Sequence, residues 1–363
     1  MSLLVVSFLT SLLVALLLVR SAGQHSRHSA DHDFAGPQKF HTRAVPRIGG
    51  VAVLLGVLAG ALFGQINGDK DTGLLWLLIL SSLPTFSFGL AEDLTKRVSA
   101  RRRLFFTAMS AALAIWLLGG VIHRTAIPGI DTLITMFPFA VALTLFVVTG
   151  VSNSVNIIDG FNGLASMCVL IMVASIAYIG FQLGDRFIII SSLVTIGAVL
   201  GFFIWNFPAG LIFLGDGGAY LLGFLLSELS VLLLVRNASV SPMFPLLLCA
   251  YPIFETVFTM YRRKFVKGVS TAEPDGIHLH TLIHRRVLRL GVGVNVERRR
   301  MARNSMTSPY LWVLCLMSVI PSVLWWNNTA ILTAFLFMFI GSYVGLYWSI
   351  VRFKTPKWLV FKQ

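Results

Sequence analysis

Two consecutive apolar runs decide the class of fold: LASMCVLIMVASIAYIGFQL at residues 164–183 and FIIISSLVTIGAVLGFFIW at residues 187–205. Each run is about as long as the 20 or so residues that an α-helix needs to cross the hydrocarbon core of a bilayer. Only Gly184, Asp185 and Arg186 separate the two runs. This stretch therefore predicts two antiparallel membrane helices joined by a tight turn.

The rest of the chain has the same character. Of its 363 residues, 56% are apolar and 12% are charged, whereas roughly a quarter of the residues in soluble domains are charged. With a mean hydropathy of +0.82, the chain has too little polar surface for a water-soluble enzyme or a DNA-binding protein. We therefore predict an all-α, polytopic integral membrane protein that forms a single transmembrane helical domain over residues 1–363.

Windows of about 20 residues predict eleven transmembrane helices. They lie at residues 3–19, 48–66, 74–91, 104–121, 133–152, 164–183, 187–205, 218–236, 242–260, 309–326 and 329–350. The three cysteines, at positions 168, 249 and 315, all fall inside these spans. They are expected to be buried free thiols and not a disulfide framework.

The basic residues assign the two sides of the membrane. Of the 29 Lys and Arg residues, 25 lie in alternate segments, which are residues 20–47, 92–103, 153–163, 206–217, 261–308 and 351–363. By the positive-inside rule this side is cytoplasmic, so the N-terminus is predicted to be periplasmic and the C-terminus cytoplasmic. The net charge of +14 is thus an indicator of topology, and no nucleic-acid partner is expected.

Acidic side chains occur where predicted helices meet the cytoplasm. They come from three separate segments and are Glu92, Asp93, Asp159 and Asp216. Residues 153–163 and 206–217 contain no Lys or Arg, so local ion pairs do not explain Asp159 and Asp216; a helix-capping role is the plainer alternative. Carboxylates that converge at one depth repel each other unless a cation lies between them. Mg²⁺, or Mn²⁺ in its place, fits such a site because it needs only one or two carboxylates and completes its shell with water and phosphate oxygens.

Basic, imidazole and amide side chains on the same side are candidates for contacts with a phosphorylated ligand. They are Lys39, His41, Arg101, Arg102, Arg103, Asn153, Asn156, Asn162, His278, His280 and Arg285. Asn153 and Asn156 stand out because amides at the end of an apolar helix must find partners. Solvated turns and a solvated basic loop are the alternatives.

One predicted span contains three prolines. Pro242, Pro245 and Pro252 lie in residues 242–260 together with Glu255. Proline removes a backbone hydrogen bond and bends a helix, so this span is expected to leave a gap. We predict a lipid groove at Pro252 and Glu255, with a tolerated kink as the alternative.

Taken together and in their order along the chain, the polar segments between Asp33 and Arg286 resemble those of the polyprenyl-phosphate N-acetylhexosamine-1-phosphate transferases. These enzymes form bacterial glycosyltransferase family 4. The branch that starts O-antigen and capsule glycolipids is the most similar, and phospho-N-acetylmuramoyl-pentapeptide transferase is related. The family's aspartate pair falls on residues 92–93, its D-G-x-D-G-L segment on 159–164, its G-D motif on 215–216 and its H-x-H-H motif on 278–281. This chain has Glu92, Asn162 and Thr281 where the family pattern has Asp, Asp and His. Asn162→Asp, which restores the family residue, is expected to be tolerated.

The resemblance implies an enzyme that transfers N-acetylhexosamine-1-phosphate from a UDP-sugar to undecaprenyl phosphate and releases UMP. Its partners would be UDP-N-acetylhexosamine, undecaprenyl phosphate and membrane lipid. The enzyme would lie in a bacterial inner membrane with its active site on the cytoplasmic face. Whether it forms a homodimer is left open. Glu92, Asp93, Asp159, His278 and His280 would be catalytic, with Asp216 and Asp93 as Mg²⁺ ligands.

Two alternatives stay open from the sequence. A phosphate monoester has a second pKa near 6 and is mostly dianionic at pH 7, which favours direct attack by the lipid phosphate over a covalent intermediate on Asp93. A membrane transporter for an anionic or nucleotide-sugar ligand is the rival class of protein. It requires ionisable groups near the middle of the bilayer, and only Glu228 and Glu255 come close.

Overall fold

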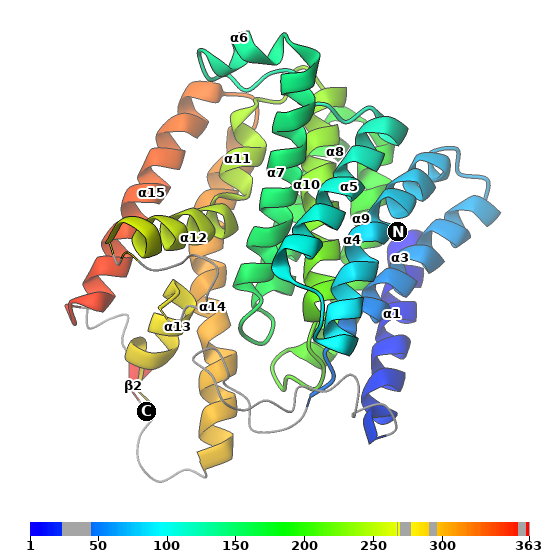
Figure 1. The fold of residues 1–363 in the computed structure, drawn as a ribbon. Helices are drawn as coiled ribbons and strands as arrows, with labels where there is room; N and C mark the ends of the chain where they lie inside the picture. The colour runs from blue at the N-terminus through cyan, green and yellow to red at the C-terminus, as the bar shows by residue number, and fades with distance from the viewer. Residues whose placement is uncertain (24–44, 267, 269–276, 290–295, 355–360, 363) are drawn as a thin grey trace.

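The computed structural model describes residues 1–23, 45–266, 268, 277–289, 296–354 and 361–362. In this part the chain is a bundle of long helices (Figure 1). The α-helices are α1 (Ser2–Arg20), α3 (Gly49–Ile66), α4 (Thr72–Thr95), α5 (Ala100–Leu118), α6 (Ile130–Ile134), α7 (Phe137–Ile158), α8 (Leu164–Leu183), α9 (Arg186–Asn206), α10 (Gly215–Arg236), α11 (Met243–Leu248), α12 (Ala250–Tyr261), α13 (Leu279–Leu282), α14 (Val296–Leu324) and α15 (Thr329–Val351). Two π-helical turns, η1 (Arg262–Val266) and η2 (Ile283–Val287), and a parallel pair of two-residue strands, β1 (Leu288–Arg289) and β2 (Phe361–Lys362), complete it.

Nine helices of the described chain are long and apolar enough to cross a membrane, which confirms the all-α, polytopic prediction. They are α1, α3, α4, α7, α8, α9, α10, the part of α14 from Arg303 to Leu324, and α15. Helix α5 forms as predicted, but three arginines in its first turn keep it outside this set. The predicted span at residues 242–260 is divided at Cys249 into α11 and α12. The number of eleven crossings and the sides of the two termini stay predictions.

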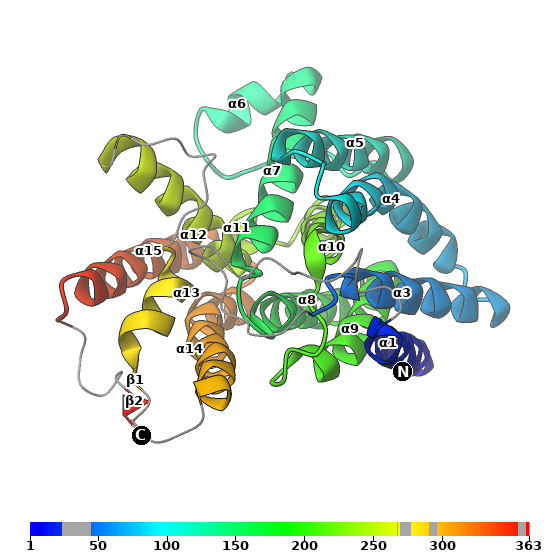
Figure 2. The same cartoon turned by 60° about the horizontal axis from the view of Figure 1, so that its bottom comes forward.

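Helix α10 is the central helix of the bundle. It packs against α3, α4, α7 and α8, and Figure 2 shows it surrounded by these helices. Nearly all of its side chains from Gly215 to Leu234 are buried. By contrast, α1 and α15 lie at the edge of the bundle with exposed apolar faces, as expected for helices that contact lipid.

Glycines bring the first turn of α10 close to its neighbours. A Cβ atom added to Gly89 of α4 would lie 2.6 Å from the Cα atom of Gly217. A Cβ atom on Gly50 of α3 would likewise overlap the backbone of Gly218. The start of α10 is therefore held by direct backbone packing between α3 and α4.

Three helices extend further than the apolar pattern predicted. Helix α4 continues to Thr95, α7 continues to Ile158, and α10 begins at Gly215. Asp93, Asn153, Asn156 and Asp216 therefore lie in terminal helical turns, where we expected loops. The helices continue because these polar side chains find hydrogen-bond partners on neighbouring helices.

Candidate active site

The predicted cytoplasmic segments converge at one end of the bundle. Four of them, residues 20–47, 153–163, 206–217 and 261–308, line a single cavity of about 300 Å³. Its polar lining consists of Arg47, Asn156, Asp159, Asn162, Asn206, Asp216, His278, His280, Thr281 and Asn304. In the described part of the chain, residues 92–103 and 351–363 do not line the cavity, although Asp93 and Arg103 of the former contact Asp216. The grouping of these segments on one side, inferred from charge alone, agrees with the structure.

Asp93 is the residue that fixes the start of α10. Its Oδ1 accepts a hydrogen bond from the backbone N–H of Asp216 (2.9 Å), and its Oδ2 accepts one from the N–H of Gly217 (2.8 Å). The side chain is only 1% exposed. An acidic side chain at a helix N-terminus both satisfies free N–H groups and opposes the positive end of the helix dipole. Asp93 thus caps α10 from a different helix.

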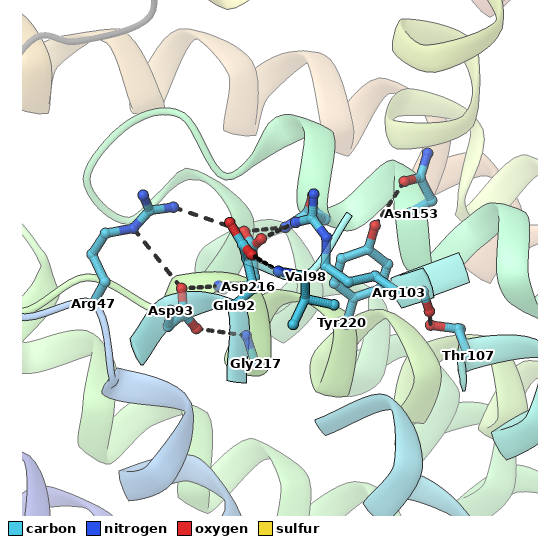
Figure 3. Close-up of polar contacts among 11 residues, drawn as sticks. Arg47, Glu92, Asp93, Val98, Arg103, Thr107, Asn153, Asp216, Gly217 and Tyr220 are labelled. Atoms are coloured by element: carbon cyan, nitrogen blue, oxygen red, sulfur yellow. Dashed lines mark hydrogen bonds and ion pairs between the residues drawn. The ribbon is translucent and has the colours of Figure 1, made fainter. Parts of the chain in front are cut away.

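Asp216 lies between two arginines, as Figure 3 shows. Its Oδ2 forms an ion pair with Arg103 Nη1, and its Oδ1 accepts a hydrogen bond from Asn156 Nδ2 (3.1 Å). Arg47 Nη2 lies 3.7 Å from Oδ1 of Asp216, and Arg47 Nε lies 4.0 Å from Oδ1 of Asp93. Arg47 lines the cavity and Arg103 lies behind Asp216, so two cations and acidic side chains meet there, an arrangement suited to a ligand that carries both phosphate and metal.

Asp159 follows directly after α7 and lines the same cavity. Burial raises the pKa of its carboxyl group to about 7, and the positive charge of Arg47 opposes that rise. Burial raises the pKa because the ionised form loses its hydration. A cation bound in the cavity would restore part of the lost stabilisation, so Asp159 is suited to contact one.

Two histidines, His278 and His280, also line the cavity. His278 and His280 stack with their ring centroids 5.0 Å apart and their planes 14° from parallel. His278 Nδ1 lies 3.0 Å from Glu255 Oε1 and 3.2 Å from Thr259 Oγ1. His280 packs against Phe161, at a centroid distance of 5.5 Å, in the loop that carries Asp159.

Several predicted site residues lie away from the cavity. Glu92 accepts a hydrogen bond from the backbone N–H of Val98 (2.7 Å) and closes the turn between α4 and α5. Asn153 accepts one from Tyr220 Oη (3.0 Å). The side chains of three predicted contacts are exposed, namely Arg101, Arg102 and Arg285. The predicted contacts at Lys39 and His41 fall outside the described residues.

The predicted lipid groove at Pro252 and Glu255 is wrong in its residues. Both side chains are buried, and Glu255 binds His278 and Tyr343, so its charge faces protein groups and not a lipid chain. An apolar cavity of about 180 Å³ does lie beside the break, but Pro242, Pro245 and Ile253 line it with side chains of α7 and α10. Figure 1 shows α12 turned sideways relative to α11.

Other residues of the cavity were not predicted from sequence. Asn206 Oδ1 accepts from the N–H of Gly163 (2.7 Å), and Asn304 Oδ1 accepts from the N–H of Asn162 (3.0 Å). Asn206 ends an apolar helix, so the argument applied to Asn153 and Asn156 would have found it. Arg47 shares its segment with other bases, and Asn304 follows a run of arginines; nothing in the sequence distinguishes them from solvated residues.

The donors in the cavity fit a hard divalent cation. Asp159 and Asp216 supply carboxylate oxygens, and Asn156 supplies an amide. In the described part of the chain, no three His, Cys, Asp or Glu side chains lie close enough together to hold a metal ion by themselves. Mg²⁺ does not need such a set, because substrate phosphates and water complete its coordination.

Comparison with known proteins identifies the family. Residues 75–234 match glycosyl transferase family 4. Over 277 residues the chain is 30% identical to the probable undecaprenyl-phosphate N-acetylglucosaminyl 1-phosphate transferase of Bacillus subtilis, and the alignment covers 76% of each protein. The chain belongs to glycosyl transferase family 4. The family 4 match runs from α4 to α10 and so contains Asp93, Arg103, Asp159 and Asp216.

Two further family 4 relatives have lower coverage. The undecaprenyl-phosphate α-N-acetylglucosaminyl 1-phosphate transferase of Thermotoga maritima is 30% identical over 252 residues, which are 69% of this chain and 72% of that protein. The phospho-N-acetylmuramoyl-pentapeptide-transferase of Oceanobacillus iheyensis is 27% identical over 210 residues, which are 54% of this chain and 64% of that protein. His278 and His280 lie beyond residues 75–234, so their place in the site rests on the cavity geometry.

Proposed function

We propose that this family 4 protein transfers N-acetylhexosamine-1-phosphate from a UDP-sugar to undecaprenyl phosphate and releases UMP, the first step of a lipid-linked glycan. The observation that carries the proposal is the single cavity at the end of a membrane bundle, in which Asp159, Asp216, Arg47 and the histidine pair meet. The names of the relatives support the same reaction.

The position of the cavity suits one lipid and one water-soluble substrate. It lies where the long helices end, which is the depth of the phosphate groups of a bilayer, so a lipid phosphate reaches it while its chain stays in the membrane. A nucleotide sugar enters from the aqueous side. The concentration of basic residues on this side of the bundle supports its assignment to the cytoplasmic face of a bacterial inner membrane.

The reaction needs positioning and charge neutralisation more than acid–base catalysis. An oxygen of the lipid phosphate attacks the phosphorus atom that carries the sugar. The bond from that atom to the bridging oxygen breaks, and UMP leaves with the oxygen. Because the lipid phosphate is mostly dianionic at pH 7, no protein base has to remove a proton, and direct attack is favoured over a covalent Asp93 intermediate.

The residues divide into anion contacts and supports. Arg47 and Arg103 are the cations beside Asp216, and with His278 they would bind phosphate oxygens. Asp93 keeps the N-terminus of α10 in place. Asp216 and Asp159 would hold Mg²⁺, which neutralises negative charge on phosphate oxygens when it is bound.

Release of UMP tests the proposal. Purified protein in nanodiscs with Mg²⁺ and undecaprenyl phosphate is incubated with UDP-N-acetylglucosamine, with other UDP-N-acetylhexosamines and with UDP-N-acetylmuramoyl-pentapeptide. We expect UMP and a lipid-linked sugar with an N-acetylhexosamine donor, and UDP-N-acetylglucosamine is the first donor to test because the relatives from Bacillus subtilis and Thermotoga maritima are named for N-acetylglucosamine.

The control is Asp216→Asn, which is expected to keep the wild-type melting temperature and to lose turnover. A folded wild-type protein that forms no UMP from any donor would refute the transferase proposal. Uptake of an intact nucleotide sugar into sealed vesicles, without UMP, would favour the transporter alternative.

A further inference from the structure

Glu255 is a fully buried acid whose two carboxylate oxygens are both engaged. Its Oε1 accepts hydrogen bonds from His278 Nδ1 (3.0 Å) and from the backbone N–H of Leu279 (3.1 Å). Its Oε2 accepts one from Tyr343 Oη (2.6 Å). This acid comes from α12, the histidine from the start of α13, and the tyrosine from α15. Figures 1 and 2 both show these three helices together on one side of the bundle.

The other buried glutamate shows that burial alone does not explain this arrangement. Glu228 of α10 is also fully buried, but neither of its carboxylate oxygens has a hydrogen-bond partner among the described residues. Glu228 does not line the site cavity. Glu255, by contrast, makes its contacts with a histidine that does line it.

The contacts of Glu255 determine which ring nitrogen of His278 faces the cavity. A carboxylate accepts hydrogen bonds, so the Nδ1 atom of His278 carries the proton that points to Glu255. Nε2 lies on the far side of the imidazole and is the nitrogen that remains for a ligand. The parallel stacking of His278 on His280 limits tilting of the ring.

We propose that Glu255 is a positioning residue that, held by Tyr343, fixes the ring of His278 so that its Nε2, when the ring carries both protons, donates to the phosphate groups of the substrates. The inference rests on the transferase reaction proposed above. It assigns the acid of α12 to the reaction and not to lipid binding. Removal of the outer contacts of metal-ligating imidazoles lowers metal affinity or activity by about 10- to 100-fold, and we expect an effect of this order at His278.

Kinetics of Glu255 variants provide the first test. Glu255→Gln keeps an oxygen that can accept from Nδ1, so we expect kcat to fall about tenfold, and Glu255→Ala removes every contact, so we expect a fall of about 100-fold. KM for the UDP-sugar is expected to stay within about threefold in both variants, because the lost interaction is made in the transition state. Glu228→Gln is the matched control, since it neutralises an equally buried acid away from the cavity, and it is expected to keep wild-type activity.

A double-mutant cycle separates positioning from a general structural effect. If Glu255 acts through His278, then Glu255→Gln causes no further loss of kcat in a His278→Asn background. Additive losses, a kcat of Glu255→Gln above half that of the wild type, or an increase in KM alone would each overturn the proposal. Because the wild-type enzyme is the reference, its failure to form UMP refutes the transferase function, whereas an active wild type with an active Glu255→Gln refutes only this inference.

A spectroscopic measurement does not depend on any Glu255 variant folding. Nitrogen NMR of wild-type protein with ¹⁵N-labelled histidine, with His278→Asn to assign the signal, reports which ring nitrogen carries the proton. We expect the neutral ring of His278 to be protonated at Nδ1. Protonation at Nε2 alone would overturn the proposal.

Discussion

Asn162→Asp is the substitution for which sequence and structure give opposite predictions. The family pattern has Asp at this position, so the sequence predicts tolerance. In the structure, however, Asn162 Nδ2 donates a hydrogen bond to the backbone carbonyl of Pro208 (3.1 Å), and the residue is 6% exposed. A carboxylate cannot donate this bond and would place negative charge beside a carbonyl oxygen.

The magnitude follows from the loss of one buried donor. The carbonyl of Pro208 keeps the hydrogen bond from Ser305 Oγ, so the loss is one hydrogen bond, about 0.5–1.5 kcal/mol, which corresponds to a decrease in melting temperature on the order of 1–3 °C for a chain of this size. Asp159 lies three residues before Asn162 in the same loop, so displacement of the loop is expected to lower kcat as well. We predict a fall of about tenfold, which corresponds to about 1.4 kcal/mol in the activation barrier.

Asn153→Asp is the matched control for this substitution. The Oδ1 atom of Asn153 accepts a hydrogen bond from Tyr220 Oη (3.0 Å), and a carboxylate accepts the same bond. Thermal unfolding in detergent and UMP release are measured for both variants. If Asn162→Asp keeps wild-type stability and activity, or if the two variants lose equally, then the hydrogen bond donated by Asn162 Nδ2 does not have the role inferred here.

Three other predictions follow from helix packing, capping and burial. Gly89→Ala, whose Cβ atom would lie 2.6 Å from Gly217 Cα, is expected to lower stability by about 1–3 kcal/mol. Gly73→Ala in the same helix, with no atom within 4 Å, should leave the melting temperature unchanged or raise it. Asp93→Asn leaves a single oxygen for the two N–H groups at the start of α10, so kcat should fall at least tenfold while the protein stays folded; wild-type kcat would contradict the capping role. Burial, with smaller effects of Arg303 and Arg285, lowers the pKa of His284 to about 4, so the unfolded chain binds a proton that the folded chain does not. Stability should fall by about 2 kcal/mol from pH 7.5 to pH 5, and His284→Gln should reduce this loss in melting experiments.

The fold was predictable where hydrophobicity alone decides it. Apolar runs of membrane length located the nine helices of the described residues that are long and apolar enough to cross a membrane, and the distribution of basic residues grouped the four segments that line the cavity. The break at Cys249 was expected from Pro242, Pro245 and Pro252. The direction of α12 after the break was not, because it depends on packing against α7, α14 and α15, which are distant from α12 in the chain.

The site was predictable at the level of motifs but not of individual roles. Asp159 and Asp216 line the cavity as expected, because an acid at a helix end without a basic neighbour in its own segment needs a partner from elsewhere. Glu92 and Asp93 are adjacent in sequence, and only the helical turn at the end of α4 decides that Asp93 faces α10 while Glu92 faces Val98. Likewise, the three consecutive arginines of α5 point in different directions, and only Arg103 contacts Asp216.

Asp93 and Glu255 show how a membrane bundle can hold a polar site rigidly. Each is a buried acid on one helix that accepts backbone N–H groups at the start of another, α10 for Asp93 and α13 for Glu255. The capped element then presents the next functional group, Asp216 in one case and His278 in the other. Burying a charge is costly unless it is paired and hydrogen-bonded, and here the compensating bonds also fix the orientation of the site. Asp93 and Glu255, unlike Glu228, are therefore caps of neighbouring elements and not isolated charges, and their partners become visible only when the helices are packed.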